Sequence, residues 1–232
     1  MITIIGTGHV FNISEQIMFL VKQIWPQAVL VELDEKRLKA MEYPESVTGQ
    51  EEVRLPWIYR STARYQARMS KKYGTRTGNE LLTAVQVGRL VGAEIGTIDV
   101  DIVKHTNDMW ADMSFRERMR YTVSTLMDRF GGKRRVEKAV ENLTESQDRT
   151  IETMRRRYPT LVKYLIDDRN RFMIEQILPY TDRLDNIVIV VGDFHVEGIV
   201  EGLKGKEIRK IRLGDILNKD SLDRIKAEVW NR

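Results

Sequence analysis

The sequence has 232 residues, contains no cysteine, and has only three histidines, at positions 9, 105 and 195. The missing thiols exclude zinc fingers built on cysteine, iron–sulfur clusters, disulfide scaffolds and cysteine nucleophiles. Any site for a soft metal would therefore have to combine these histidines with carboxylates. The lack of cysteine fits a reducing cytoplasm or a hot habitat without deciding between them.

Long hydrophobic runs are also missing. The longest, Ile187–Val191, is far shorter than the ~20 residues that a membrane-spanning helix needs. Met1 leads directly into the apolar segment Ile2–Ile5, which is typical of a first strand and not of a signal peptide. We therefore expect no membrane span in this chain and expect it to be soluble.

Positive charge exceeds negative charge only slightly. Lys and Arg total 38 and Asp and Glu total 34, which gives a net charge of +4. Basic clusters at 133–135 and 155–157 carry much of the excess, but acidic residues such as Glu137, Glu141 and Glu152 are interleaved with them. This pattern favours a solvated helical face, so we expect no nucleic-acid partner.

Apolar segments alternate with amphipathic helical segments along the chain. The predicted strands cover residues 2–5, 28–33, 94–100, 187–191 and 208–213. Because helices return the chain between strands, the pattern predicts an α/β fold with a mostly parallel central sheet of about four to six strands and flanking helices. Strand building pauses between the third and fourth strands, so a mainly helical insertion is expected at about 103–181, within a single domain spanning 1–232.

Short signals predict where helices begin. Capping boxes are expected at Asn12 with Glu15, Ser114 with Glu117 and Thr144 with Gln147. Asp34 is expected to cap a short helix that ends near Met41. A polar loop is expected over 44–54, followed by a helix that begins at Pro56.

The sharpest feature is a Gly-x-x-His segment that occurs twice. Gly6-Thr7-Gly8-His9 and Gly192-Asp193-Phe194-His195 each follow an apolar strand and precede a helix. Ligands of open α/β sheets bind beyond the carboxyl ends of the strands, where both histidines are predicted to lie. A helix N-terminus beside each histidine disfavours the charged ring, and neutral imidazole is the form that binds metal or acts as a base. A hydrogen-bonded structural histidine is the alternative for each.

Carboxylates are predicted at the same edge. Glu32 ends the second strand, and Asp99 and Asp101 follow the third. Two histidines with one or two carboxylates make a divalent-metal site with a place for water. The alternatives are a solvated strand end for Glu32, helix caps for Asp99 and Asp101, and a favourable position in the first helical turn for Glu80.

Other motifs point to chemistry less strongly. His105 lies among polar residues, and we expect a surface or loop position for it. Gly6-Thr7-Gly8 lacks the third glycine of a dinucleotide fingerprint and the lysine of a P-loop. No serine stands in a Gly-x-Ser-x-Gly context, which removes that nucleophile motif.

These residues, taken in order, resemble the TraB/PrgY family over nearly the whole chain, from Met1 to about Leu213. The matching segments are Gly6–Val10, Val31–Asp34 with Arg37, Gly78–Glu80 with Ala84, Ile98–Ile102 with Trp110 and Met113-Ser114, Asp167–Asn170 with Met173, and Gly192–Ile199. Each motif alone is short, but six in sequence are specific. The family includes pheromone-shutdown proteins and the Tiki metalloproteases, and it is related to the erythromycin-esterase and ChaN-like groups.

The resemblance implies a metal-dependent hydrolase that acts on peptide or signal-peptide substrates. By matching position, His9, Glu32, Glu80 and His195 become the predicted ligands of a divalent metal ion (Mn, Co or Zn) and catalytic residues. Arg169 is then expected to stabilise an oxyanion or to orient a carboxylate. Many archaeal relatives carry membrane helices after this domain, so the protein is expected to be cytoplasmic, or membrane-associated through a C-terminal region missing here.

The chain departs from the family pattern at Val100 and Asp108, where arginines are common, and at Asp193 and Phe194, where small residues are common. These changes put substrate contacts in question. They motivate a second hypothesis, a non-catalytic regulator that binds or sequesters a peptide or small ligand. A third hypothesis is a homodimer that uses the helices of 114–180.

Overall fold

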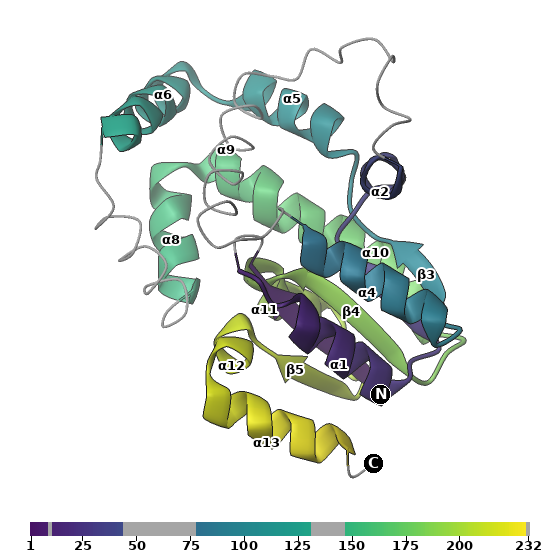
Figure 1. Cartoon of the computed structure of the whole chain (residues 1–232). Helices are drawn as coiled ribbons and strands as arrows, with labels where there is room; N and C mark the ends of the chain where they lie inside the picture. Colours follow the sequence, from purple (N-terminus) through teal and green to yellow (C-terminus); the bar gives the residue numbers. More distant parts are fainter. Residues whose placement is uncertain (9–10, 44–77, 131–146, 231–232) are drawn as a thin grey trace.

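A computed structural model describes residues 1–8, 11–43, 78–130 and 147–230 (Figure 1). His9, the loop predicted over 44–54, the helix predicted from Pro56 and the capping box predicted at Thr144 lie at least partly outside these residues.

The described elements alternate between strands and helices. In chain order they are β1 (Ile2–Thr7), α1 (Ser14–Ile24), β2 (Ala28–Val31), α2 (Glu35–Glu42), α4 (Asn79–Leu90), β3 (Glu94–Thr97), α5 (Ile102–Asp112), α6 (Phe115–Phe130), α8 (Gln147–Arg157), α9 (Pro159–Val162), the π-helical segment η2 (Lys163–Asp168), α10 (Arg169–Thr181), β4 (Ile187–Gly192), the 3₁₀ turn η3 (Asp193–His195), α11 (Val196–Gly202), β5 (Ile208–Ile211), α12 (Leu213–Leu217) and α13 (Lys219–Trp230).

The five strands form one parallel sheet in the order β3-β2-β4-β1-β5. β4 is the central strand, and its Ile189 lies between Ile4 of β1 and Leu30 of β2. The predicted fold class is therefore confirmed, and the described residues between β3 and β4 form helices and turns, as expected for the insertion. Three strands end earlier than predicted, β2 at Val31, β3 at Thr97 and β5 at Ile211, whereas β1 and β4 extend further, to Thr7 and Gly192.

Helices cover the two faces of the sheet. Ile5, Val31 and Val190 pack in one core with α1, α4 and α13. Their chain neighbours Ile4, Leu30 and Ile189 point to the other face and pack with α10 and α11. Figure 1 shows α1 and α4 on one side of the sheet. Burial on both faces explains why the strands appear as continuous apolar runs.

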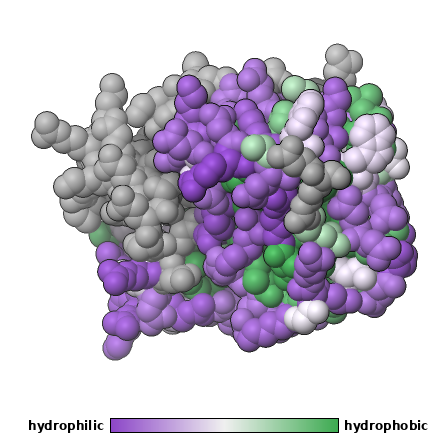
Figure 2. Space-filling view, turned by 90° about the horizontal axis from the view of Figure 1, so that it is seen from below, coloured by the Kyte–Doolittle hydropathy of each residue, from purple (hydrophilic) through white to green (hydrophobic). Residues whose placement is uncertain are grey.

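The helical insertion has a smaller core of its own. Met109 and Met113 from the α5 region pack there with Leu161, Val162 and Tyr164 from α9 and η2. On the face shown in Figure 2, hydrophilic residues predominate among the coloured atoms, and hydrophobic ones gather in small clusters. Among the helices that the structure describes, none combines the length and the apolar character that crossing a membrane requires.

The predicted helix starts have mixed outcomes. Asp34 caps α2 by accepting a hydrogen bond from the Arg37 backbone N–H at 2.9 Å, as expected. The Asn12–Glu15 capping box is wrong, because α1 begins at Ser14 and its N-cap residue, Ile13, has no side chain that can cap. Ser14 instead accepts a hydrogen bond at 2.9 Å from Asn79, which ties the start of α1 to the start of α4.

Candidate functional site

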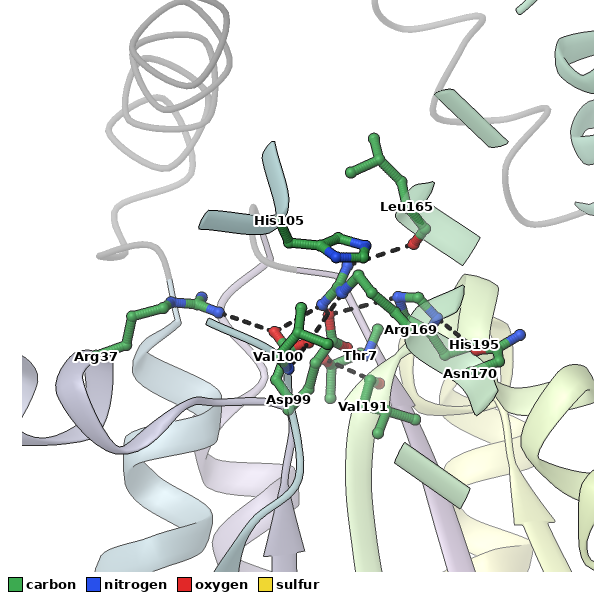
Figure 3. Close-up of polar contacts among 12 residues, drawn as sticks. Thr7, Arg37, Asp99, Val100, His105, Leu165, Arg169, Asn170, Val191 and His195 are labelled. Carbon is green, nitrogen blue, oxygen red and sulfur yellow. Dashed lines mark hydrogen bonds and ion pairs between the residues drawn. The ribbon is translucent and has the colours of Figure 1, made fainter. Parts of the chain in front are cut away.

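The carboxyl edge of the parallel sheet brings together side chains that are far apart in sequence. Glu32 follows β2, Asp99 lies just beyond β3, and His195 ends the η3 turn that follows β4. Backbone hydrogen bonds fix the ends of these strands, since the Glu32 N–H donates to Val190 and the Asp99 N–H donates to Leu33. Figure 3 shows Asp99, Arg169 and His195 converging there.

Glu32 is buried, with 3% of its surface exposed. Its Oε1 accepts a hydrogen bond from Nη2 of Arg169, and its Oε2 accepts one from the backbone N–H of Gly192. A Cβ at Gly192 would lie 3.2 Å from Oε2, so a glycine there lets the end of β4 approach the carboxylate closely. The carboxylate is thus held from β4 on one side and from α10 on the other.

Arg169, the first residue of α10, joins two acids. It donates to Asp99 through Nε at 2.9 Å and Nη2 at 2.8 Å, and its bond to Glu32 also comes from Nη2. Burial alone would lower the pKa of Arg169, but the charges of Glu32 and Asp99 and their hydrogen bonds outweigh it and raise the pKa above its ordinary value. Arg37 of α2 adds a second cation, 3.2 Å from Asp99 Oδ2.

His195 is oriented by Asn170, the neighbour of Arg169 in the chain. The His195 Nδ1 lies 2.7 Å from Asn170 Oδ1, and its Nε2 lies 3.5 Å from Glu32 Oε1. An amide oxygen only accepts hydrogen bonds, so this contact is a hydrogen bond when Nδ1 carries a proton. The other ring nitrogen, Nε2, faces Glu32.

Glu80, predicted from the family pattern, is buried in the first turn of α4, with 1% of its surface exposed. α4 leads into β3 and runs back along the parallel sheet, so it begins at the carboxyl edge, where Asn79 contacts Ser14 at the start of α1. Within the described ranges, no three His, Cys, Asp or Glu residues come close enough to hold a metal ion. Since His9 lies outside those ranges, the four-residue ligand set remains a prediction.

Asp193 stands at one of the positions where the chain departs from the family pattern. It begins the η3 turn that His195 ends, and its side chain contacts a later part of the chain. It accepts hydrogen bonds from Arg212 Nε and Nη2, each at 3.0 Å, and from the Leu213 backbone N–H at 2.9 Å. A Cβ at Gly6 would overlap the Asp193 carboxylate, so the glycine of the first motif leaves room for the aspartate of the second. Asp193 thereby anchors the His195 turn to β1 and to the start of α12.

His105 does not lie in a loop, because it stands within helix α5, but it keeps part of its surface exposed. It is half-buried, and its Nε2 is 2.8 Å from the backbone oxygen of Tyr164. Polar neighbours suggested a loop, but Asp101 caps the helix by accepting from the Lys104 N–H at 3.1 Å. The alternative of a cap thus holds for Asp101, whereas Asp99 binds Arg169 and Arg37.

Sequence reasoning gave no role to Asn170 or Arg37, although both stand in the segments that carry the family resemblance. The position of Asn170 directly after Arg169 was the one available signal. Its contact with His195 depends on how α10 packs against α11, and a sequence pattern does not specify that packing.

Comparison with known proteins supports the resemblance. A sequence profile described as the TraB/PrgY/gumN family matches residues 1–209 of the chain. An uncharacterized protein of Methanocaldococcus jannaschii is 27% identical over 219 residues, which cover 89% of this chain and 54% of that protein. The chain thus spans about half the length of this curated relative.

Proposed function

The chain belongs to the TraB/PrgY/gumN family, and from this premise we propose that it is a metal-dependent hydrolase that acts on peptide bonds. Its centre lies at the carboxyl edge of the sheet. His195 and Glu32 supply two metal ligands, and His9 and Glu80 are the further ligands or bases that the family pattern predicts.

The proposal depends on one observation, the 3.5 Å distance between His195 Nε2 and Glu32 Oε1. Zinc binds histidine nitrogen and carboxylate oxygen at roughly 2.0–2.2 Å, which places two ligands of a tetrahedral site about 3.3–3.6 Å apart. The two side chains are each 4% exposed, so an ion held between them would be largely shielded from solvent. The described residues therefore fit one edge of such a site.

The surrounding residues have the roles that a metal centre requires. A bound divalent ion supplies Lewis-acid activation of a water molecule and of a substrate carbonyl. Asn170 holds the His195 ring by its other nitrogen, which is the usual outer contact of a metal-binding histidine. Arg169 places a positive charge beside Glu32 and fixes its orientation. With Glu32 assigned to the ion, Glu80 would act as general base toward the water if it does not itself bind the ion.

Two hydrogen bonds of Glu32 favour the second hypothesis, in which the protein binds a ligand but does not catalyse a reaction. Both oxygens of Glu32 already accept hydrogen bonds from Arg169 and Gly192. A carboxylate held in this way can stabilise the fold of a ligand-binding cleft without taking part in a reaction. The substitutions at Val100 and Asp108 relative to the family pattern agree with altered substrate contacts.

Metal analysis tests the first proposal. The chain is stripped with a chelator, dialysed against Mn²⁺, Co²⁺ or Zn²⁺, and its metal content measured. We expect about one ion per chain, which Glu32→Gln or His195→Ala abolishes. The control is His105→Asn, which removes a histidine of the helical insertion and should retain the ion. No ion with any of the three metals would contradict the proposal.

A peptide library separates the two functions. Cleavage that stops with chelator and in Glu32→Gln indicates a hydrolase. Saturable binding of peptides that stay intact indicates a binding protein. Circular dichroism of each variant confirms that the fold is retained.

A further inference from the structure

We propose that Asn170 is a positioning residue that selects the Nδ1–H tautomer of His195 and thereby directs the Nε2 lone pair toward Glu32. The inference deepens the proposed function, because this tautomer is the one that binds metal at the predicted centre. The tautomer itself is a property of the metal-free chain and can be measured independently of any activity.

Among the residues that the structure describes, Asn170 and Glu32 each present an oxygen atom to a nitrogen of the His195 ring. Asn170 Oδ1 lies 2.7 Å from Nδ1, whereas Glu32 Oε1 lies 3.5 Å from Nε2. Hydrogen bonds between nitrogen and oxygen are strongest near 2.9 Å and are weak at 3.5 Å. The shorter contact therefore determines which ring nitrogen is protonated. It places the proton on Nδ1, although the carboxylate is the stronger acceptor in isolation.

The Asn170 amide lies between α11 and His195. Its Nδ2 atom occupies the space that a Cβ on Gly198 would fill, and its Oδ1 atom faces His195. One turn later, a Cβ on Gly202 would overlap Ile174. Because α11 presents no side chain at these two positions, α10 can approach closely enough for the amide to reach the imidazole.

Two consecutive residues of α10, Arg169 and Asn170, therefore orient the carboxylates and the histidine of the site. Arg169 extends to Glu32 and Asp99, while Asn170 extends to His195. Figure 3 shows Arg169 beside Asp99, and Asn170 beside His195. Consecutive helical residues point about 100° apart, so neighbouring positions reach different partners. The π-helical segment Lys163–Asp168 ends directly before this dipeptide, and such segments occur frequently at functional sites.

Nuclear magnetic resonance of the metal-free, ¹⁵N-labelled chain tests the tautomer. Long-range ¹H–¹⁵N spectra at a pH where the ring is neutral distinguish protonated from unprotonated ring nitrogens, and His195→Gln identifies the signals. We expect Nδ1–H in the native chain, and Nε2–H for most molecules of Asn170→Leu, which has similar size but no acceptor. Asn170→Asp retains the acceptor and should retain Nδ1–H.

Two results would overturn the proposal: Nε2–H in the native chain, or unchanged Nδ1–H in folded Asn170→Leu. The first needs no variant, so the test holds even if Asn170→Leu does not fold. Metal titration then separates this inference from the proposed function. If the chain binds metal, Asn170→Leu should weaken binding about 10- to 100-fold, and Asn170→Asp should stay within a few-fold of the native chain. If the native chain binds no metal, the proposed function fails while the tautomer result stands.

Discussion

The carboxyl edge of the sheet and the helical insertion each contain a buried glutamate, and the two are used differently. Glu32 and Glu117 are similarly buried, at 3% and 4% exposed. Glu117 Oε1 accepts hydrogen bonds from the backbone N–H groups of Thr160 at 3.0 Å and Leu161 at 3.2 Å, so it caps the start of α9. Glu32 contacts a side-chain cation and a histidine. Burial of a glutamate therefore does not by itself identify a functional site. The chemical nature of the hydrogen-bonding partners is what distinguishes Glu32 from Glu117.

The two described histidines differ in the same way. Each has one ring nitrogen close to an oxygen atom, at 2.7 Å for His195 and 2.8 Å for His105. For His195, the other nitrogen faces a buried carboxylate. The His105 ring instead packs against the ring of Tyr164, with 5.0 Å between ring centroids. His195, between an oriented amide and a carboxylate, has the arrangement that the proposed centre requires, whereas His105 packs on an aromatic ring.

The largest effect is expected for Arg169→Leu. It leaves Glu32 and Asp99 buried without their shared cation, and breaking a buried ion pair from one side costs about 3–5 kcal/mol. Urea unfolding at pH 7 measures the loss. The matched control in the insertion is Arg155→Leu, because Arg155 also forms two hydrogen bonds with a carboxylate, that of Asp167. The difference is exposure, since the side chains of this pair are 42% and 37% exposed. We expect about 0.2–1 kcal/mol there. Equal losses would remove the distinction between the two regions.

A smaller effect is expected for Glu117→Ala. The substitution leaves two backbone N–H groups at the start of α9 without their acceptor, which should destabilise the protein by about 1–3 kcal/mol. Glu117→Gln keeps an acceptor oxygen and should recover most of that loss. Metal content should be unchanged in both variants. A loss of metal in Glu117→Gln would show that the insertion contributes to the centre directly.

The sequence predicted the strands, the helices and the positions of the site residues better than it predicted the contacts between them. Continuous apolar strands that alternate with helices are local patterns, so the α/β fold and the carboxyl-edge position of Glu32 and His195 were predictable. The placement of β4 between β1 and β2 depends on long-range pairing, which no local pattern specifies. Ser114 and Glu117 illustrate the limit. The Ser114 hydroxyl accepts from the Glu117 N–H at 3.2 Å, as a capping box requires, but the carboxylate caps α9, 43 residues further along the chain.

The smallest effect concerns Tyr164, the partner of His105. A hydrogen bond to Asp112, burial and nearby negative charge raise the pKa of Tyr164 from 10.0 to about 12. Because the folded pKa exceeds the unfolded one, the stabilisation is complete below pH 10 and is lost as the pH rises toward 12. We expect Tyr164→Phe to be less stable than the native chain by roughly 0.5–1.5 kcal/mol at pH 9, the usual contribution of one hydrogen bond. Urea unfolding at intervals between pH 9 and pH 11.5 should show that difference in unfolding free energy shrinking.

The matched test at the sheet edge is Asn170→Asp. This substitution changes no tyrosine contact, so its difference in stability from the native chain should stay constant over the same pH range. A Tyr164→Phe difference that does not change with pH would mean that ionisation of the Tyr164 hydroxyl is not linked to folding, and would contradict the prediction.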